Sequence, residues 1–135
     1  MTYEKFEDLP VWQEAMLLAE GVDDLLRQIP KEQLSYSKRD QIDRSSLSVS
    51  NNISEGFERG TTPDLLKFIY IARGSSAETR SMLIFILRRP YLSQFKEAAQ
   101  KLKEITTSCS KQLRAWAAHL QQSDIKGQRH LNNHK

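Results

Sequence analysis

The sequence of 135 residues predicts an all-α fold, an antiparallel up-down bundle of four helices. Apolar residues recur at steps of three and four along four separate segments, which is the spacing of one helical face. No segment alternates apolar and polar residues for long enough to form a strand. Only five glycines and four prolines interrupt the chain, so long helices with short connections are favoured.

The first two helices are bounded by prolines, a serine and glycines. The first is expected over residues 10–29, because Pro10 suits a first helical turn and Pro30 ends the periodic pattern. The second is expected to begin after Ser37, its predicted N-cap. It should end within residues 56–60, where two glycines fit a helix C-terminus.

The last two helices are followed by a polar segment. The third is expected over residues 62–87, with Thr62 as its N-cap, and the fourth over residues 93–120. Residues 121–135 are polar, contain a glycine and lack periodicity, so we interpret them as a flexible tail. The chain is therefore expected to be one domain, a bundle over residues 1–120 with a tail.

Residues 44–60 are the centre of the chain, because five serines and two asparagines lie there within a helical pattern. These residues are indifferent helix formers, so their small size or their hydrogen bonds should be needed. Small residues also lie midway along the third helix, in 72–78, which suggests that the two helices cross there. A polar stripe is interpreted as a network that fixes helix register, or alternatively as a surface shared with another subunit or a ligand. Its residues are Arg44, Asn52, Glu55 and Arg59 of the second helix and Arg73, Ser75 and Glu78 of the third.

Catalytic chemistry finds no support in the sequence. A serine nucleophile needs a base and an orienting partner, but all three histidines lie at or beyond the end of the fourth helix. Ser35 and Lys38 match the Ser-x-x-Lys pattern of acylating enzymes, but no companion motif accompanies them. The Glu-x-x-His pairs of di-metal bundles are absent, and Cys109 stands alone. We therefore expect a non-enzymatic protein without metal or another cofactor.

The composition indicates a cytoplasmic protein. Hydrophobic residues make up 39% and charged residues 27%, as in globular chains. The lone cysteine, Cys109, excludes an intramolecular disulfide and fits a reducing compartment. No apolar run approaches the roughly 20 residues that cross a bilayer. The acidic N-terminus lacks the apolar core of a signal peptide, so we expect no membrane partner.

Positive charge gathers in the last third of the chain. Residues 1–37 hold three bases and eight acids, residues 38–85 hold seven and six, and residues 86–135 hold ten and three. Four bases of the fourth helix fall within about 80° of one another on a helical wheel. This face is predicted to bind the phosphate backbone of RNA or DNA, the alternative being an ordinary solvated face. The candidate nucleic-acid-binding residues are Arg88, Arg89, Lys96, Lys103, Lys111 and Arg114.

Three groups of motifs resemble those of a known family. The first comprises FEDLPVWQEA at residues 6–15 and IPKE at residues 29–32. The second is QIDRSSLSVSNNISEGFERG at residues 41–60, and the third is IARGSSAE at residues 71–78, preceded by Phe68. Together they resemble the four-helix-bundle proteins encoded in intervening sequences of bacterial large-subunit rRNA genes. That family includes the accessory variability determinant (Avd) proteins of diversity-generating retroelements.

The resemblance covers residues 4–87 and implies a four-helix bundle that assembles into a ring-shaped homopentamer. For the Avd relatives it also implies binding of RNA or DNA and of a reverse transcriptase. No member of the family is known as an enzyme. Ser50 stands where the family usually has a proline, so we expect a second helix without the family's kink.

Two function hypotheses follow from the sequence. One is a non-enzymatic nucleic-acid-binding accessory protein, such as the Avd partner of a retroelement reverse transcriptase. The other is a protein-interaction ring without a nucleic-acid role. Both assume a homo-oligomer, because the second helix carries apolar or small residues on more than one side. Trp12, Phe57 and Tyr70 are the candidate contacts between subunits.

Overall fold

Four long helices make up the protein. The computed structural model describes the backbone of residues 2–133 and the side chains of residues 2–123. The described residues contain no strand, so the predicted all-α class with four helices is confirmed. The helices are α1 (Pro10–Gln28), α2 (Tyr36–Arg59), α3 (Thr62–Leu87) and α4 (Lys96–Asn133), with the short 3₁₀ turns η1 (Phe6–Asp8), η2 (Lys31–Gln33) and η3 (Pro90–Phe95).

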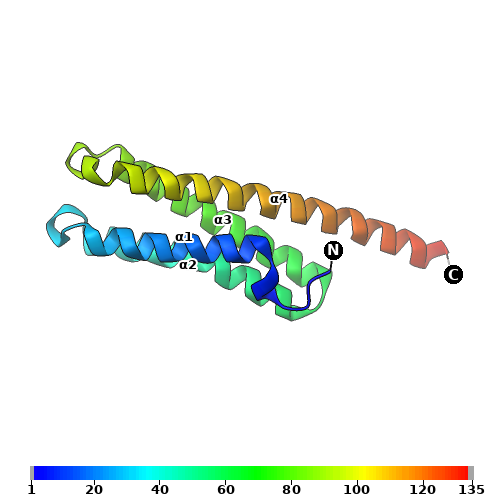
Figure 1. Cartoon of the computed structure of the whole chain (residues 1–135). Coiled ribbons are helices and arrows are strands. Elements are labelled where there is room, and N and C mark those ends of the chain that lie inside the picture. The colour runs from blue at the N-terminus through cyan, green and yellow to red at the C-terminus, as the bar shows by residue number, and fades with distance from the viewer. Residues whose placement is uncertain (1, 134–135) are drawn as a thin grey trace.

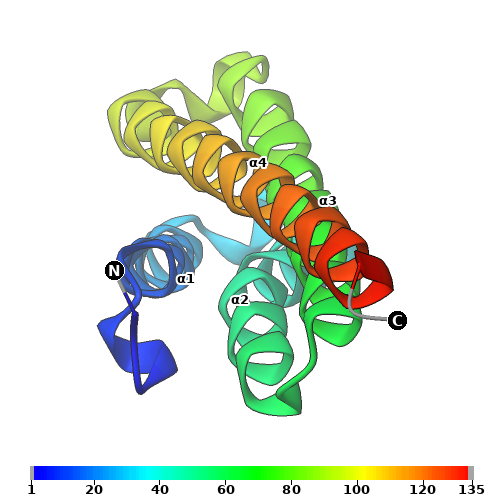
Figure 2. The ribbon, with the colours of Figure 1, turned by 90° about the vertical axis from the view of Figure 1, so that its right-hand side faces the viewer.

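Each helix packs antiparallel to the next one along the chain, and α4 returns to pack against α1 (Figures 1 and 2). The core lies between the helices and contains the small residues of α2 and α3 where these two cross. Gly56 permits close approach of the two helices near their connection, because a Cβ added to it would lie 2.8 Å from the Cβ of Phe68. The largest apolar contributors with almost no exposure are Leu18, Val22 and Leu25 of α1, Ile42, Val49 and Ile53 of α2, Ile69, Leu83 and Ile86 of α3, Leu92 of η3, and Leu113 of α4.

Two helix caps differ from the predicted ones. The N-cap of α2 is Ser35, and its Oγ accepts a hydrogen bond from the backbone N–H of Lys38 at 3.3 Å. Ser37 already lies inside the helix, because the extended backbone that a cap requires occurs at Ser35. This bond also gives the Ser-x-x-Lys pattern a structural role. The N-cap of α3 is Thr61, so Thr62 is the first helical residue.

The bounds of α4 also differ from prediction. Residues 90–95 form η3, in which Leu92 has a non-helical backbone, and α4 begins only at Lys96. The predicted end at Leu120 was wrong, because the helix continues to Asn133 and extends beyond the other three (Figure 1). The single glycine in this stretch costs about 1 kcal/mol, which is too little to end a helix without a proline. The flexibility of residues 121–135 stays a prediction, and residues 134–135 lie outside the described part.

Arg39, near the start of α2, ties that helix to the end of α1. Its Nη1 donates to the carbonyl of Leu26 at 2.7 Å, and its Nε donates to that of Leu34 at 2.9 Å. Its Nη2 donates to the carbonyls of Ile29 at 2.8 Å and Pro30 at 2.6 Å. The last carbonyls of a helix lack intrahelical partners, so the guanidinium supplies partners in this turn. No pattern in the sequence marks Arg39 for this role.

Candidate nucleic-acid interface

The predicted bases of α4 lie on the side of that helix that faces α3. Hydrogen bonds orient the helix: Ser110 Oγ donates to Ser76 of α3 at 3.0 Å, and Gln112 Nε2 donates to Glu14 of α1 at 3.1 Å. Lys103 and Arg114 lie within about 40° of Ser110 around the helix axis. They lie about 160–180° from Gln112. Both bases therefore border the line where α3 and α4 meet.

The other predicted bases lie on either side of this line. Lys96 begins α4 in the same direction as Arg114, and Lys111 points about 60° further toward solvent. Arg88 is the exposed C-cap of α3. The Arg89 guanidinium lies 5.4 Å from the ring centre of Tyr91 and 6.0 Å from that of Phe85. These aromatic contacts hold Arg89 at the connection between α3 and α4.

The charges near this line are not matched by ion pairs. Each of the three salt bridges among residues 2–123 lies within α1 or α2. They join Arg27 to Asp23, Arg44 to Asp40 and Arg59 to Glu55, each across one helical turn. In the described part of the chain, the α4 bases have no carboxylate within salt-bridge distance, so their charge is directed to solvent.

The predicted polar network joins α2 to α3 through fewer residues than expected. Ser75 Oγ donates to Ser48 Oγ at 2.9 Å, and Asn52 Nδ2 donates to the same oxygen at 2.8 Å. Glu78 accepts from Gln41 of α2 at 3.2 Å. The predicted members Arg44, Glu55 and Arg59 form their salt bridges within α2. Arg44 and Glu55 therefore do not link the two helices through these bonds, whereas the Arg59 guanidinium also lies 5.1 Å from the ring centre of Phe68 of α3.

Arg73, a predicted member of this network, lies on a different side of α3 from Ser75. It lies about 160° around α3 from Ser75, the residue that contacts α2. It lies only about 60° from Ser76, which contacts α4. Arg73 therefore borders the same line as the α4 bases. The angular spacing around the helix shows from the sequence that Arg73 and Ser75 lie on different sides of α3. It does not show which of these sides faces α2.

Buried hydroxyl groups link three of the four helices. Thr79 Oγ1 donates to Ser45 Oγ at 2.9 Å, which joins α3 to α2. Ser76 Oγ donates to the carbonyl of Thr106 at 3.0 Å and accepts from Ser110, which joins α3 to α4. These contacts explain why small polar residues occupy the helix crossing. We call the set Ser45, Ser48, Ser75, Ser76, Thr79, Thr106 and Ser110 the hydroxyl layer.

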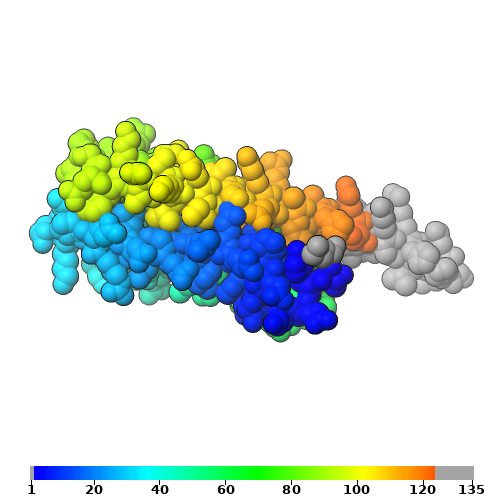
Figure 3. Space-filling view, in the orientation of Figure 1, coloured from blue at the N-terminus to red at the C-terminus, as the bar shows by residue number. Residues whose placement is uncertain are grey.

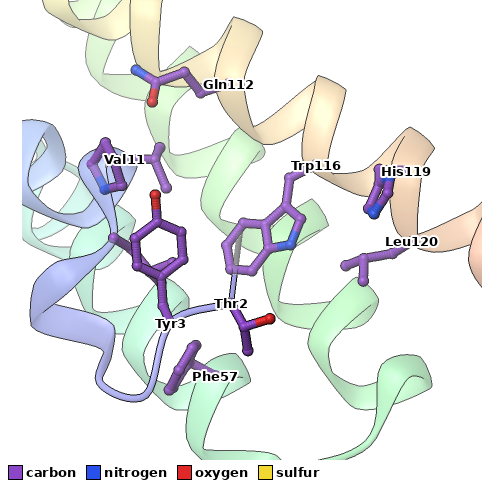
Figure 4. A pocket seen from close by; sticks show the side chains of 10 residues that line it. Thr2, Tyr3, Val11, Phe57, Gln112, Trp116, His119 and Leu120 are labelled. Atoms are coloured by element: carbon purple, nitrogen blue, oxygen red, sulfur yellow. The ribbon is translucent and has the colours of Figure 1, made fainter.

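The three predicted subunit contacts lie in different settings. Trp12 is half-buried, and its ring meets that of Phe6 edge-on at 5.3 Å. Tyr70 is 43% exposed, and its hydroxyl accepts a hydrogen bond from Gln121 of α4. Phe57 lines a hollow of about 570 Å³ with Trp116 and other residues of the N-terminal segment, α1 and α4 (Figure 4). Their role as contacts between subunits stays a prediction.

The cysteine and a histidine, two side chains that often carry chemistry, lie in different settings. Cys109 has no exposed surface, and burial raises the pKa of its thiol to about 12, so it stays protonated at neutral pH. His119 lines the hollow of Figure 4, which Thr2 and Tyr3 also line. The described residues contain no group of three or more metal-ligating side chains. Within the same part, no helix is both long and apolar enough to cross a bilayer.

The structure is that of an all-α protein of four helices. Basic side chains on α3 and α4 form no salt bridge among residues 2–123. The chain belongs to the 23S rRNA-intervening sequence protein family, whose model matches residues 7–115. This confirms the family that the motifs resemble, and membership of the Avd group stays a prediction. A comparison with curated proteins finds no match.

A solved structure has the same fold. It is the crystal structure of a protein with unknown function from the S23 ribosomal protein family of Bacteroides thetaiotaomicron. It is 23% identical in sequence, with a TM-score of 0.72, and the match covers 79% of this chain and 97% of that one. At this identity the similarity supports the fold alone.

Proposed function

We propose that the protein is a non-enzymatic accessory protein that binds the phosphate backbone of RNA or DNA. Lys96, Lys103, Lys111 and Arg114 of α4 carry the binding, and Arg88 contributes from the end of α3. In the cytoplasmic setting expected from the sequence, an Avd-like partnership with a reverse transcriptase is the specific form of this role. A homo-oligomeric ring, most simply a pentamer, would repeat the basic surface and bind multivalently.

One observation carries the proposal: Lys96, Lys103, Lys111 and Arg114 share one side of α4, and the salt bridges among residues 2–123 leave them unpaired. Bases that neutralise phosphates release counterions, so binding should be independent of sequence and should weaken steeply with salt. Lys103 is half-buried while Lys111 and Arg114 are exposed. A lysine beside a helix–helix contact can bury its methylene groups and keep its ammonium group in water.

The test replaces Lys103, Lys111 and Arg114 together by glutamine. Affinity for a structured RNA or a duplex DNA should fall, and its salt dependence should flatten, while circular dichroism stays that of the parent. The control neutralises Arg27, Lys31 and Lys67, which are exposed and lie away from the α4 bases. Equal affinity of both triple variants and the parent, or equal losses in both variants, would refute α4 as the binding site.

An apolar hollow favours the second candidate, a protein-interaction ring without a nucleic-acid role. On the face where α1 and α4 lie side by side (Figure 3), a hollow of about 390 Å³ is lined by Leu17, Leu102 and Ile105 among others. Leu17 is 59% exposed beside this apolar hollow, and the two together offer an apolar surface for a protein contact. Light scattering with Leu17→Glu decides whether this surface supports assembly: a change in mass with unchanged nucleic-acid affinity favours the second candidate.

A further inference from the structure

A second helix contributes bases to the same surface. Arg80 lies about 40° around α3 from Ser76, the residue that meets α4, and Arg73 lies about 60° from it on the same side. Arg80 is exposed and Arg73 is half-buried. Because the helices are antiparallel and Ser76 contacts Thr106 and Ser110, Arg80 lies level with Lys103. Arg73 lies about two turns further along, level with the part of α4 between Lys111 and Arg114.

Acidic side chains lie away from this line. Glu78 of α3 contacts Gln41 of α2, on the far side of α3 from the arginines. Glu97 and Glu104 of α4 point about 80–100° away from the direction of Lys96 and Arg114. Among residues 2–123, no salt bridge involves Arg73 or Arg80. We call Arg73, Arg80, Lys96, Lys103 and Arg114 the basic seam.

We propose that the basic seam is a two-edged site for the backbone of a nucleic-acid duplex, with Arg73 and Arg80 forming its α3 edge. The inference rests on the proposed function and names the form of nucleic acid bound. Basic side chains on two neighbouring helices can contact the backbone of a rigid duplex along two lines at once. The basic side chains of a single helix follow only one line. A guanidinium can also hold two oxygens of one phosphate through its planar fork.

The side chains between the arginines and lysines of the basic seam favour a duplex over a single strand. Proteins that bind single strands without sequence preference stack bases on aromatic side chains along a charged groove. The middle of the seam holds Ala77, Ile84 and Thr107 instead. Tyr70 lies at one end, where its hydroxyl is engaged by Gln121, and Tyr91 lies at the other end against Arg89. The seam therefore offers phosphate contacts without a stacking platform along its length.

The length of the seam sets the expected footprint. From Lys96 to Arg114 the helix rises by about 27 Å. A duplex advances about 3.4 Å for each base pair, so one chain should cover about eight base pairs. Affinity should rise steeply with duplex length up to this size and more gradually beyond it. This length dependence distinguishes a seam from a single anion-binding point.

The decisive variant replaces Arg73 and Arg80 by glutamine and leaves α4 intact. Each phosphate contact contributes about 0.9 to the slope of log affinity against log salt. The double variant should lower that slope by about 1.8 and reduce duplex affinity by up to about 60-fold at about 0.1 M salt. Arg80→Gln alone, at an exposed position, should lower the slope by about 0.9, so the test does not depend on the half-buried Arg73.

The probes are an RNA hairpin and a DNA hairpin, each with a stem longer than the expected footprint, and unpaired strands of the same length. Fluorescence anisotropy across a salt series measures both affinity and slope. The matched control is the double variant Arg27→Gln and Arg44→Gln, which removes two exposed arginines that pair within α1 and α2. The control should bind within a few-fold of the parent, and both hairpins should bind more tightly than the strands.

The outcomes separate this inference from the proposed function. If the α3 variants bind like the parent while the α4 triple variant loses affinity, the two-edged seam is wrong and the proposed function stands. If unpaired strands bind as tightly as the hairpins, the duplex assignment is wrong. If the α3 and α4 variants all bind like the parent, both the seam and the proposed function fail.

Discussion

Replacing Arg39 by alanine is expected to break the main polar connection between the end of α1 and the start of α2. The guanidinium donates to four backbone carbonyls at 2.6–2.9 Å. Three of these bonds are partly buried, and the fourth, to Pro30, is exposed. After truncation, the carbonyls that end α1 lose a charged donor that also complements the negative end of the helix dipole.

The expected loss can be worked out from these bonds. A hydrogen bond from a charged donor contributes about 1.5–3 kcal/mol to stability when buried. Water can reach part of this turn once the side chain is gone, so we assign about 1 kcal/mol to each partly buried bond and nothing to the exposed one. The total is about 3 kcal/mol. Arg39→Lys should lose about 2 kcal/mol, because an ammonium cannot reproduce the planar fork that reaches several carbonyls together.

Urea unfolding followed by far-UV circular dichroism, at one protein concentration for all variants, measures these losses. The matched control is Arg44→Ala, five residues further along α2, where an exposed ion pair with Asp40 should contribute about 0.5 kcal/mol. A loss below about 1 kcal/mol for Arg39→Ala, or one equal to that of the control, would refute the role assigned to the guanidinium.

Further predictions concern two glycines and the cysteine. Gly56→Ala should lower the free energy of unfolding by about 1–3 kcal/mol, because its Cβ would lie 2.8 Å from the Cβ of Phe68. Gly74→Ala should raise the free energy of unfolding by up to about 1 kcal/mol, because no neighbouring helix lies within 4 Å of the added Cβ. Equal effects of the two alanine substitutions in urea unfolding would contradict both predictions. Burial raises the pKa of Cys109 from 9.0 to about 12, so the folded state keeps a proton that the unfolded state loses above pH 9. The contribution of the protonated thiol to the free energy of unfolding is fully present below pH 9 and should fall by about 1.4 kcal/mol for each pH unit between 9 and about 12. Cys109→Ser should remove this decrease when urea unfolding is measured at alkaline pH.

Periodicity predicted the helices well because burial of one face is a local pattern repeated many times. The bounds of α1 were predicted within one residue, since Pro10 and Pro30 restrict the backbone directly. The caps of α2 and α3 were missed by one or two residues, because several adjacent side chains can cap and only the backbone conformation selects one. The end of α4 was missed because its last residues lack an apolar stripe but also lack a strong helix breaker.

The candidate site was predicted in its α4 half only. Lys103 and Arg114 could be grouped from the spacing on a single helix. Arg73 and Arg80 join them only through the packing of α3 on α4, which one sequence does not specify. Arg39 was missed for a similar reason, since its carbonyl partners come from the chain's path through the connection. Contacts within one helix follow from spacing, whereas contacts between helices require their relative rotation.

The hydroxyl layer also determines how the molecule can deform. Sliding α3 by one turn would move its hydroxyls by about 5.4 Å and break their hydrogen bonds to Ser45 and Ser48 of α2 and to Thr106 and Ser110 of α4. α2, α3 and α4 therefore behave as a rigid frame that resists shear. α1 lies outside this layer and is anchored at its C-terminal end by Arg39 and further along by the bond between Glu14 and Gln112. Because the buried side of α1 is apolar along its length, α1 adjoins this frame through a surface that resists separation but carries no hydroxyl pairs to fix its register.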